Sequence, residues 1–240
     1  MNDDALHAPL APRTIAIFGV VCGVVASLIF TLWPQIDLFT SALFYEGKGR
    51  FLLIGNPLGT IPRSIFKILF ITFCAIALIG LLVTAFRRSR LFGLGVPHWA
   101  YLVACLVIGP GLLTNTILKD NWGRARPIQT EQFGASGKFT PALVPSQACN
   151  RNCSFVSGES SSIFMAFFAL ALLLSNYRKL LLAAGVLIGS ASGLVRIGMG
   201  GHFLSDVAFS GIFMLLTASA LYWLIFTKLA HKTETLPHHR

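Results

Sequence analysis

Six long, apolar and almost uncharged stretches constrain what this chain can fold into. About 20 apolar residues in helical conformation are needed to cross the hydrocarbon interior of a bilayer, and a helix satisfies every backbone polar group on the way. The expected spans are Ile15–Trp33, Ile68–Phe86, His98–Leu118, Ser157–Ser175, Leu180–Val195 and Phe203–Thr227. We therefore expect an all-α integral membrane protein, a six-transmembrane-helix bundle with one membrane-embedded domain over residues 1–240.

The composition limits the partners of the chain. Hydrophobic residues make up 55% and charged residues 12%, about half the charged fraction of an ordinary soluble domain. The net charge of +10 favours an anionic partner, such as a nucleic acid, an anionic lipid or a phosphate-bearing substrate. The basic residues lie between apolar stretches and form no continuous face, so we expect a bilayer and a lipid, and no nucleic acid.

Two local features of the expected spans affect the path of the chain. The segment Ile36–Tyr45 is amphipathic, and it fits either a helix lying flat in the interface or a simple connecting loop. Pro110 lies inside the third span and is expected to kink it, which membrane helices tolerate when neighbours satisfy the backbone.

Charge between the spans gives a partial indication of orientation. Three basic groups, with the N-terminus, would be cytoplasmic by the positive-inside rule: Arg87, Arg88 and Arg90; Arg178 and Lys179; and Lys228, Lys232 and Arg240. The opposite side carries a comparable set: Lys119, Arg124, Arg126, Lys138, Arg151 and Arg196. Charge alone therefore does not fix the orientation, unless the second set serves to bind phosphate.

The first of three polar clusters on that opposite side follows the third span. It contains Lys119, Arg124 and Arg126, followed by Pro127. These cations fit contact with lipid headgroups equally well as capture of phosphate oxygens, for which arginine offers a planar fork and lysine a point charge.

The second cluster is Ser157-Gly158-Glu159, at the start of the fourth span. Free backbone N–H groups at the start of a helix bind phosphate, and Gly158 would let an anion approach the backbone closely. An ordinary capped helix with an acidic first turn explains the same residues.

The third cluster joins Arg196, His202 and Asp206. Positions i and i+4 share one face of a helix, so Asp206 can fix the tautomer of the His202 imidazole. The glycines at 198, 200 and 201 would allow a tight turn before the helix. A structural His–Asp pair that joins helices is the alternative.

Together the clusters supply cations, a helix N-terminus and a His–Asp pair on one side of the membrane. Phosphoryl transfer requires little beyond positioning and charge compensation. No acidic cluster of metal-ligand character accompanies them, so we expect no metal cofactor. Cys149 and Cys153, in a polar loop on this side, fit two free thiols or a local disulfide.

These motifs resemble those of the type 2 phosphatidic acid phosphatase (PAP2) superfamily, which includes vanadium haloperoxidases. The first motif, Lys, six residues and Arg-Pro, is matched by Lys119 and Arg126-Pro127. The third is matched by Arg196, His202 and Asp206, with Val195 replacing its serine. The second motif, Pro-Ser-Gly-His, is matched only at Ser157 and Gly158, because Glu159 replaces the histidine.

The resemblance implies a six-helix PAP2-type phosphatase that acts through a phosphohistidine without a cofactor. His202 would attack phosphorus and Asp206 would orient it. The phosphate would be bound by Lys119, Arg126, Arg196, Ser157 and Gly158, with Arg124 and Glu159 as further candidate site residues. The site would face the periplasm from a bacterial inner membrane, with cytoplasmic termini.

Glu159 is the main departure from the family pattern. The family histidine protonates the leaving oxygen. A carboxyl group could do so only with a pKa raised toward neutrality, which the surrounding cations would oppose. Orientation of water and contact with the lipid headgroup are the alternative roles for Glu159. The Ser-Gly-Glu variant resembles the branch that contains bacterial lipid A 4′-phosphatases. The substrate expected from this is lipid A or another phospholipid. Phosphatidylglycerophosphate, phosphatidic acid and undecaprenyl diphosphate are alternatives, as is a non-enzymatic lipid-binding or transport protein on the same scaffold.

Overall fold

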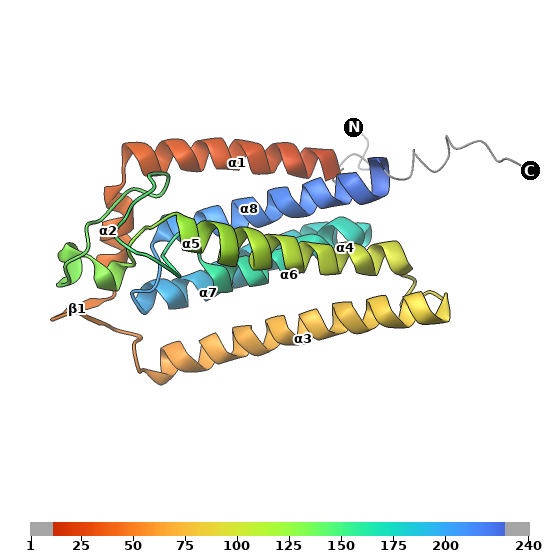
Figure 1. Cartoon of the computed structure of the whole chain (residues 1–240), viewed down its shortest axis with the longest axis horizontal. Coiled ribbons are helices and arrows are strands. Elements are labelled where there is room, and N and C mark those ends of the chain that lie inside the picture. The colour runs from red at the N-terminus through yellow and green to blue at the C-terminus, as the bar shows by residue number, and fades with distance from the viewer. Residues whose placement is uncertain (1–11, 229–240) are drawn as a thin grey trace, which may run out of the picture.

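A computed structural model describes residues 12–228, and the chain in this range is an antiparallel helical bundle (Figure 1). Its long helices are α1 (Pro12–Leu32), α3 (Pro57–Arg87), α4 (Val96–Leu106), α6 (Gly158–Leu173), α7 (Arg178–Gly198) and α8 (Leu204–Trp223). Within the described range, five helical stretches are long and apolar enough to cross a membrane, while α6 is apolar but has 16 residues. The all-α membrane fold is confirmed, with five candidate spans.

The third span changes its helix type along its length. After α4 it continues as the π-helix η2 (Val107–Leu118) and the short helix α5 (Lys119–Asn121). Pro110 lies within η2; proline has no N–H to donate, and its ring crowds the carbonyl one turn earlier. The Asn115 side chain donates to the Pro110 carbonyl over 2.7 Å. Around Pro110 the helix therefore changes from the α type to the π type.

Helix α6 lies at the centre of the bundle, in contact with α7 and α8. Most of its side chains are buried, which explains why the sequence is apolar on every side. On α7, glycines at 185, 189 and 193 let α6 and α7 approach closely. A Cβ at Gly189 would lie 2.5 Å from the Phe164 ring of α6. At the other end of α6, buried Arg178 donates to the carbonyls of Ala171 and Leu172.

Helix α3 begins at Pro57, earlier than the expected start at Ile68. The Asn56 side chain caps it by accepting from the Leu58 N–H over 2.9 Å. The added turns carry Arg63 and Lys67, whose charges ended the apolar stretch in the sequence. With 31 residues, α3 is about 46 Å long, so it reaches beyond the hydrocarbon layer.

The connection between α1 and α3 contains helix α2 (Gln35–Ala42), so of the two interpretations of residues 36–45 the helical one is correct up to Ala42. It is followed by an antiparallel hairpin of β1 (Tyr45–Gly47) and β2 (Arg50–Phe51). Helix α2 is anchored at its start, because its only acidic residue, Asp37, is completely buried.

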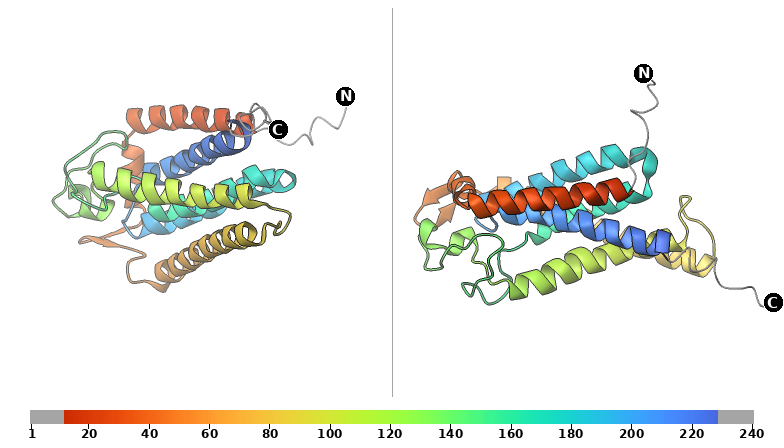
Figure 2. Two further views of the ribbon diagram at one scale, coloured as in Figure 1. Left: turned by 45° about the vertical axis from the view of Figure 1, so that its right-hand side comes forward. Right: turned by 90° about the horizontal axis from the view of Figure 1, so that it is seen from above.

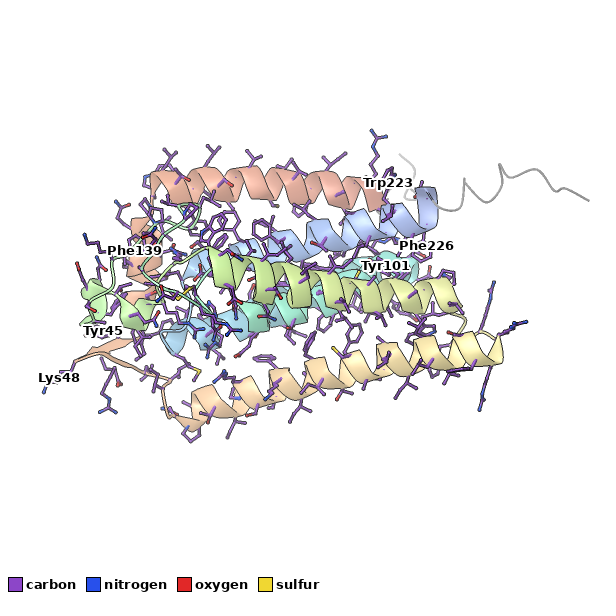
Figure 3. The ribbon with its side chains drawn as sticks, viewed as in Figure 1. Tyr45, Lys48, Tyr101, Phe139, Trp223 and Phe226 are labelled. Atoms are coloured by element: carbon purple, nitrogen blue, oxygen red, sulfur yellow. A yellow bond between two sulfur atoms is a disulfide. The ribbon has the colours of Figure 1, made fainter. Side chains whose placement is uncertain are left out.

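The two ends of the bundle differ in character (Figures 1 and 2). One end holds α2, the hairpin, the 122–157 connection and the α7–α8 turn. That connection contains the 3-10 helices η3 (Pro127–Gln129) and η4 (Glu131–Phe133). Figure 3 shows Tyr45 and Phe139 at this end, and Tyr101 and Phe226 at the other.

The opposite end holds the start of α1, the Arg87–Arg90 connection, η5 (Ser175–Tyr177) and η6 (Leu224–Lys228), which follows α8. The expected cytoplasmic position of the termini concerns residues 1–11 and 229–240, including Lys232 and Arg240, which lie outside the described residues.

Candidate active site

The three clusters meet at the end of the bundle that holds α2 and the hairpin. Lys119 begins α5 and Arg126 follows it in the loop. Ser157, Gly158 and Glu159 start α6. Arg196 lies in the last turn of α7, His202 lies in the α7–α8 turn, and Asp206 lies in the first turn of α8. Gly200, with a φ of +62°, makes that turn possible in a conformation that other residues rarely adopt.

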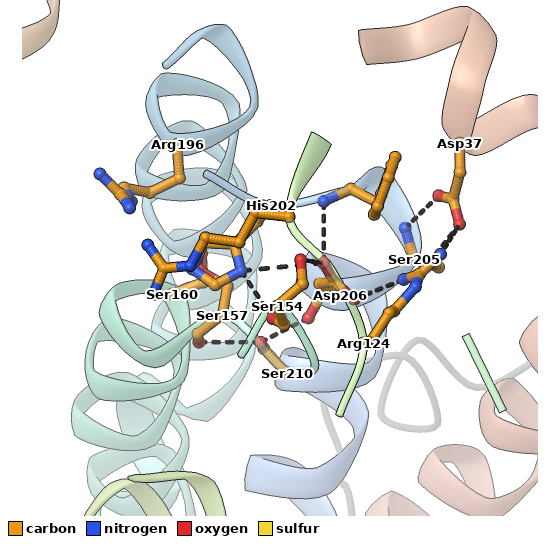
Figure 4. Close-up of polar contacts among 12 residues, drawn as sticks. Asp37, Arg124, Ser154, Ser157, Ser160, Arg196, His202, Ser205, Asp206 and Ser210 are labelled. Carbon is orange, nitrogen blue, oxygen red and sulfur yellow. Dashed lines mark hydrogen bonds and ion pairs between the residues drawn. The ribbon is translucent and has the colours of Figure 1, made fainter. Parts of the chain in front are cut away.

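The imidazole of His202 is held in one tautomer (Figure 4). Its Nδ1 lies 2.7 Å from the Ser154 carbonyl oxygen. Because a carbonyl only accepts, Nδ1 carries the hydrogen and Nε2 presents a lone pair. The side chain is 2% exposed, and burial lowers the pKa of His202 to about 4, although Asp206 opposes this shift. The ring is therefore neutral at neutral pH.

Asp206 acts on His202 mainly through Ser154. Its Oδ2 accepts from the Ser154 hydroxyl over 2.5 Å and from the Phe203 N–H over 2.8 Å. The same oxygen is 3.7 Å from His202 Nδ1, which is too long for a hydrogen bond. The i, i+4 spacing brings the two residues together as expected, but the direct acceptor is the Ser154 carbonyl, which the sequence did not suggest.

Arg124, a further candidate residue from the first cluster, is directed into the protein. It is completely buried, and its guanidinium donates to Asp206 Oδ1 over 2.5 Å, to Asp37 Oδ2 over 2.8 Å and to two other oxygens. It also packs over the Phe203 ring, 4.4 Å from the centroid. Its donors are thus used within the protein.

Asp37 is a second member of the site that the sequence did not reveal. Its Oδ1 accepts from the Ser205 N–H over 2.8 Å, and its Oδ2 accepts from the Ser205 hydroxyl and from Arg124. Burial raises the pKa of Asp37, and the positive charge of Arg124 opposes the rise. A lone acidic residue in an apolar stretch beside a membrane was the available signal.

Three cationic side chains lie around the start of α6. A Cβ added to Gly158 would be 2.8 Å from Lys119 Nζ, and one added to Gly201 would be 2.5 Å from Arg196 Nη2. Arg126 Nη2 donates to the Asn152 carbonyl over 2.7 Å. Burial lowers the pKa of Arg126, which is the cost of withdrawing a cation from water. An anion bound here would offset this cost.

Ser157 is the N-cap residue of α6 and is completely buried. Its hydroxyl donates to Ser160 Oγ over 3.1 Å, and its N–H donates to the Asp206 carbonyl over 3.2 Å. The first amides of α6 that follow have no acceptor inside the helix. They add a favourable dipole to the side where Lys119 lies.

Glu159 lies between two arginines. Its Oε1 is 2.9 Å from Arg63 Nε and 3.7 Å from Arg196 Nε. Arg63 comes from α3, far away in the sequence, and no local motif could have identified it. Glu159 is thus placed to hold these two arginines in position.

Backbone hydrogen bonds join the loop before Ser154 to the first cluster. Cys149 and Cys153 form a disulfide, with 5.7 Å between their Cα atoms. The backbone N–H groups of Cys153 and Ser154 donate to the carbonyls of Lys119 and Arg124, each over 2.9 Å. The Ser154 carbonyl that accepts from His202 is thus positioned by the segment that also carries Lys119 and Arg124.

Comparison with known proteins agrees with this geometry. The PAP2 superfamily model matches residues 97–230. The chain is 35% identical to a lipid A 4′-phosphatase of Francisella tularensis subsp. novicida, over 88% of this chain and 96% of that protein. It is 32% identical to a lipid A 4′-phosphatase of Rhizobium leguminosarum, over 80% and 88% of the two chains.

A solved structure has the same fold. It is the crystal structure of a transmembrane PAP2-type phosphatidylglycerolphosphate phosphatase from Bacillus subtilis, with a TM-score of 0.51 and 18% identity over 95% of this chain and 98% of that chain. The resemblance inferred from the motifs is therefore confirmed: this multi-pass membrane protein belongs to the PAP2 superfamily of phosphatases.

Proposed function

We propose that this protein is a lipid phosphate monoesterase that removes the 4′-phosphate of lipid A through a phosphohistidine on His202. The observation that carries the proposal is the tautomer of His202, whose Nδ1 is bound to the Ser154 carbonyl. The lone pair of Nε2 is then available beside a group of cations. The similarity to lipid A 4′-phosphatases over most of the chain supports the choice of substrate.

In the proposed reaction, Lys119, Arg126 and Arg196 bind the oxygens of the phosphate, together with Ser157 and the Gly158 amide. Nε2 of His202 attacks phosphorus, a P–N bond forms and the P–O bond to the lipid breaks. The leaving oxygen takes up one proton from solvent water and departs as the lipid hydroxyl. A second water then attacks phosphorus, a P–O bond forms as the P–N bond breaks, the proton of this water is released to solvent, and inorganic phosphate leaves neutral His202.

Positive side chains supply the charge compensation in this mechanism, so we propose that no metal ion takes part. Glu159 serves as the anchor of Arg63 and Arg196. Asp206 and Ser154 keep the imidazole in its tautomer. Asp37 and Arg124 support Asp206 from the side away from the substrate.

For the membrane arrangement, we propose that α6 crosses as a sixth span inside the other helices, and that residues 1–240 form one phosphatase domain. Its 16 residues correspond to about 24 Å, and burial inside the protein removes the need to match the lipid thickness. The basic Arg87–Arg90 connection would be cytoplasmic. The site at the opposite end would then face the periplasm from a bacterial inner membrane.

The test uses purified protein in detergent with a chelator and no added metal. Lipid A, phosphatidylglycerophosphate and undecaprenyl diphosphate are offered in turn, and released phosphate and the lipid product are measured. We expect the native protein to remove the 4′-phosphate from lipid A, and we expect the His202→Ala variant to release no phosphate. His98→Ala, at the other end of the bundle, is the matched control. Release only from another lipid, or full activity of His202→Ala, would overturn the proposal.

A further inference from the structure

A cavity of about 550 Å³ opens beside the proposed phosphate site, between α3, η2 and the start of α6. Lys119, Gly158 and Glu159 line it on the phosphate side. The volume is in the range of pockets for drug-sized ligands, and a single phosphate group fills only a small part of it. The cavity therefore has room for more of the substrate than the group that is hydrolysed.

The α3 wall of this cavity carries two cations. Thr60, Arg63, Ser64, Phe66, Lys67 and Phe70 line it, and the recurrence of these positions at intervals of three or four residues places them along one side of the helix. Charged residues in membrane helices face the protein interior or a polar cavity and mark paths of substrates. The face of α3 that carries Arg63 and Lys67 therefore fits a polar ligand in this cavity.

The charges in the cavity do not cancel. Among the lining residues, Arg63, Lys67 and Lys119 are cationic and Glu159 is acidic. Glu159 is already engaged by Arg63, at 2.9 Å, and Lys119 belongs to the group around His202. Lys67 is left as a positive charge without a role in hydrolysis, one turn of α3 beyond Arg63, or about 6 Å along the helix.

The depth of Lys67 is that of a lipid headgroup. It lies ten residues after Pro57, the first residue of α3, which is about 15 Å along the helix axis. The uncharged stretch Ile68–Phe86 that follows Lys67 is about 28 Å long as a helix, close to the thickness of the hydrocarbon layer, so Lys67 lies close to the boundary between headgroups and acyl chains. A second charged group of a lipid whose phosphate is at His202 would be at this level.

From these observations we propose that Arg63 and Lys67 form a subsite for a second anionic group, a phosphate or a carboxylate, on the same lipid substrate. The subsite makes the protein selective for lipids that carry at least two anionic groups. This inference rests on the proposed function, because it takes the hydrolysed phosphate to lie beside His202.

The experiment measures binding separately from hydrolysis. An acylated disaccharide lipid with two phosphates is compared with its counterpart that has the same acyl chains and only the phosphate to be hydrolysed. Dissociation constants for both lipids are measured in detergent on His202→Ala protein, with and without Lys67→Gln. We expect Lys67→Gln to reduce the preference for the doubly phosphorylated lipid about fivefold.

Lys48→Gln is the matched control, because Lys48 lies at the tip of the hairpin, away from the cavity (Figure 3). It should leave the preference unchanged. An equal effect of Lys67→Gln on both lipids, or no effect, would overturn the subsite. Phosphate release by the protein with native His202 is measured in parallel. Absence of release from both lipids would refute the proposed function, while the binding ratio would still decide the subsite.

Discussion

Asp37 and Asp206 share one counter-ion, although they lie at opposite ends of the sequence. The Arg124 guanidinium is 2.8 Å from Asp37 Oδ2 and 2.5 Å from Asp206 Oδ1, and all three side chains are buried. Each carboxylate also accepts from other buried donors, so the removal of either one leaves those donors without a partner. The position of Asp206, and through Ser154 that of His202, therefore depends on a residue in the first connection of the bundle.

Asp37→Asn tests this dependence. Arg124 would lose one of its two anionic partners, and we expect stability to fall by about 2 kcal/mol and kcat to fall about tenfold, with a smaller change in KM. Thermal unfolding in detergent and steady-state kinetics provide the measurements. Asp120→Asn, which alters a partly exposed pair with Arg151 at 3.8 Å, should have little effect on either. Equal effects of the two substitutions would contradict the dependence.

Ser154→Ala separates the hydroxyl of Ser154 from its carbonyl. The carbonyl that accepts from His202 remains, whereas the bond from the hydroxyl to Asp206 Oδ2 is lost. We expect kcat to fall about tenfold, as for loss of one hydrogen bond to a charged group. The inhibition constant of inorganic phosphate should stay the same, because the cations are untouched. A parallel loss of phosphate affinity would show a general distortion; Ser136→Ala, in an exposed part of the same connection, is the control.

Glu159→Gln distinguishes an anchor from a proton donor. As an anchor of Arg63 and Arg196, its loss should raise KM about three- to fivefold and leave the shape of the kcat–pH profile unchanged. Loss of a general acid would instead reduce kcat by about 100-fold or more and remove one limb of the profile. Glu131→Gln, on the exposed surface of η4, provides the reference.

The low pKa of His202 links folding stability to pH. In the unfolded chain the imidazole has a pKa of about 6.5, whereas burial lowers it to about 4 in the folded protein. Between these values the unfolded state binds a proton that the folded state does not, so stability falls as the pH decreases. We expect the melting temperature to decrease more steeply between about pH 7 and pH 4.5 than in His202→Gln. Equal slopes would contradict a neutral buried imidazole.

The bundle was predictable where the apolar stretches are continuous, as in α1 and α7. The start of α3 was not, because Arg63 and Lys67 interrupt its apolar pattern and their cavity exists only in three dimensions. A hydrophobicity pattern shows only which segments avoid water. In the sequence, a charged residue that faces a polar cavity cannot be distinguished from a charged residue in a loop.

Motif spacing predicted that five residues lie together at one end of the molecule, as they do: Lys119, Arg126, Arg196, His202 and Asp206. It could not separate Arg124 from Arg126, since the direction of a side chain in a loop depends on its tertiary partners. Arg124 turns inward to Asp37 and Asp206, while Arg126 binds the Asn152 carbonyl. Asp37 was missed for a similar reason, because its partners Arg124 and Ser205 lie far along the chain.

The burial of Asp37 also has a consequence for fragments of this protein. The family model matches residues 97–230, and that segment contains every motif residue. It does not contain Asp37, the second carboxylate that binds Arg124, which belongs to α2. A fragment with the motifs alone would keep the Arg124–Asp206 pair, but Arg124 Nη2 and the N–H and hydroxyl of Ser205 would lose their buried acceptor. The segment that carries the motifs therefore contains a buried hydrogen-bond network that only α2 completes, and the N-terminal part of the chain is a structural component of the candidate site.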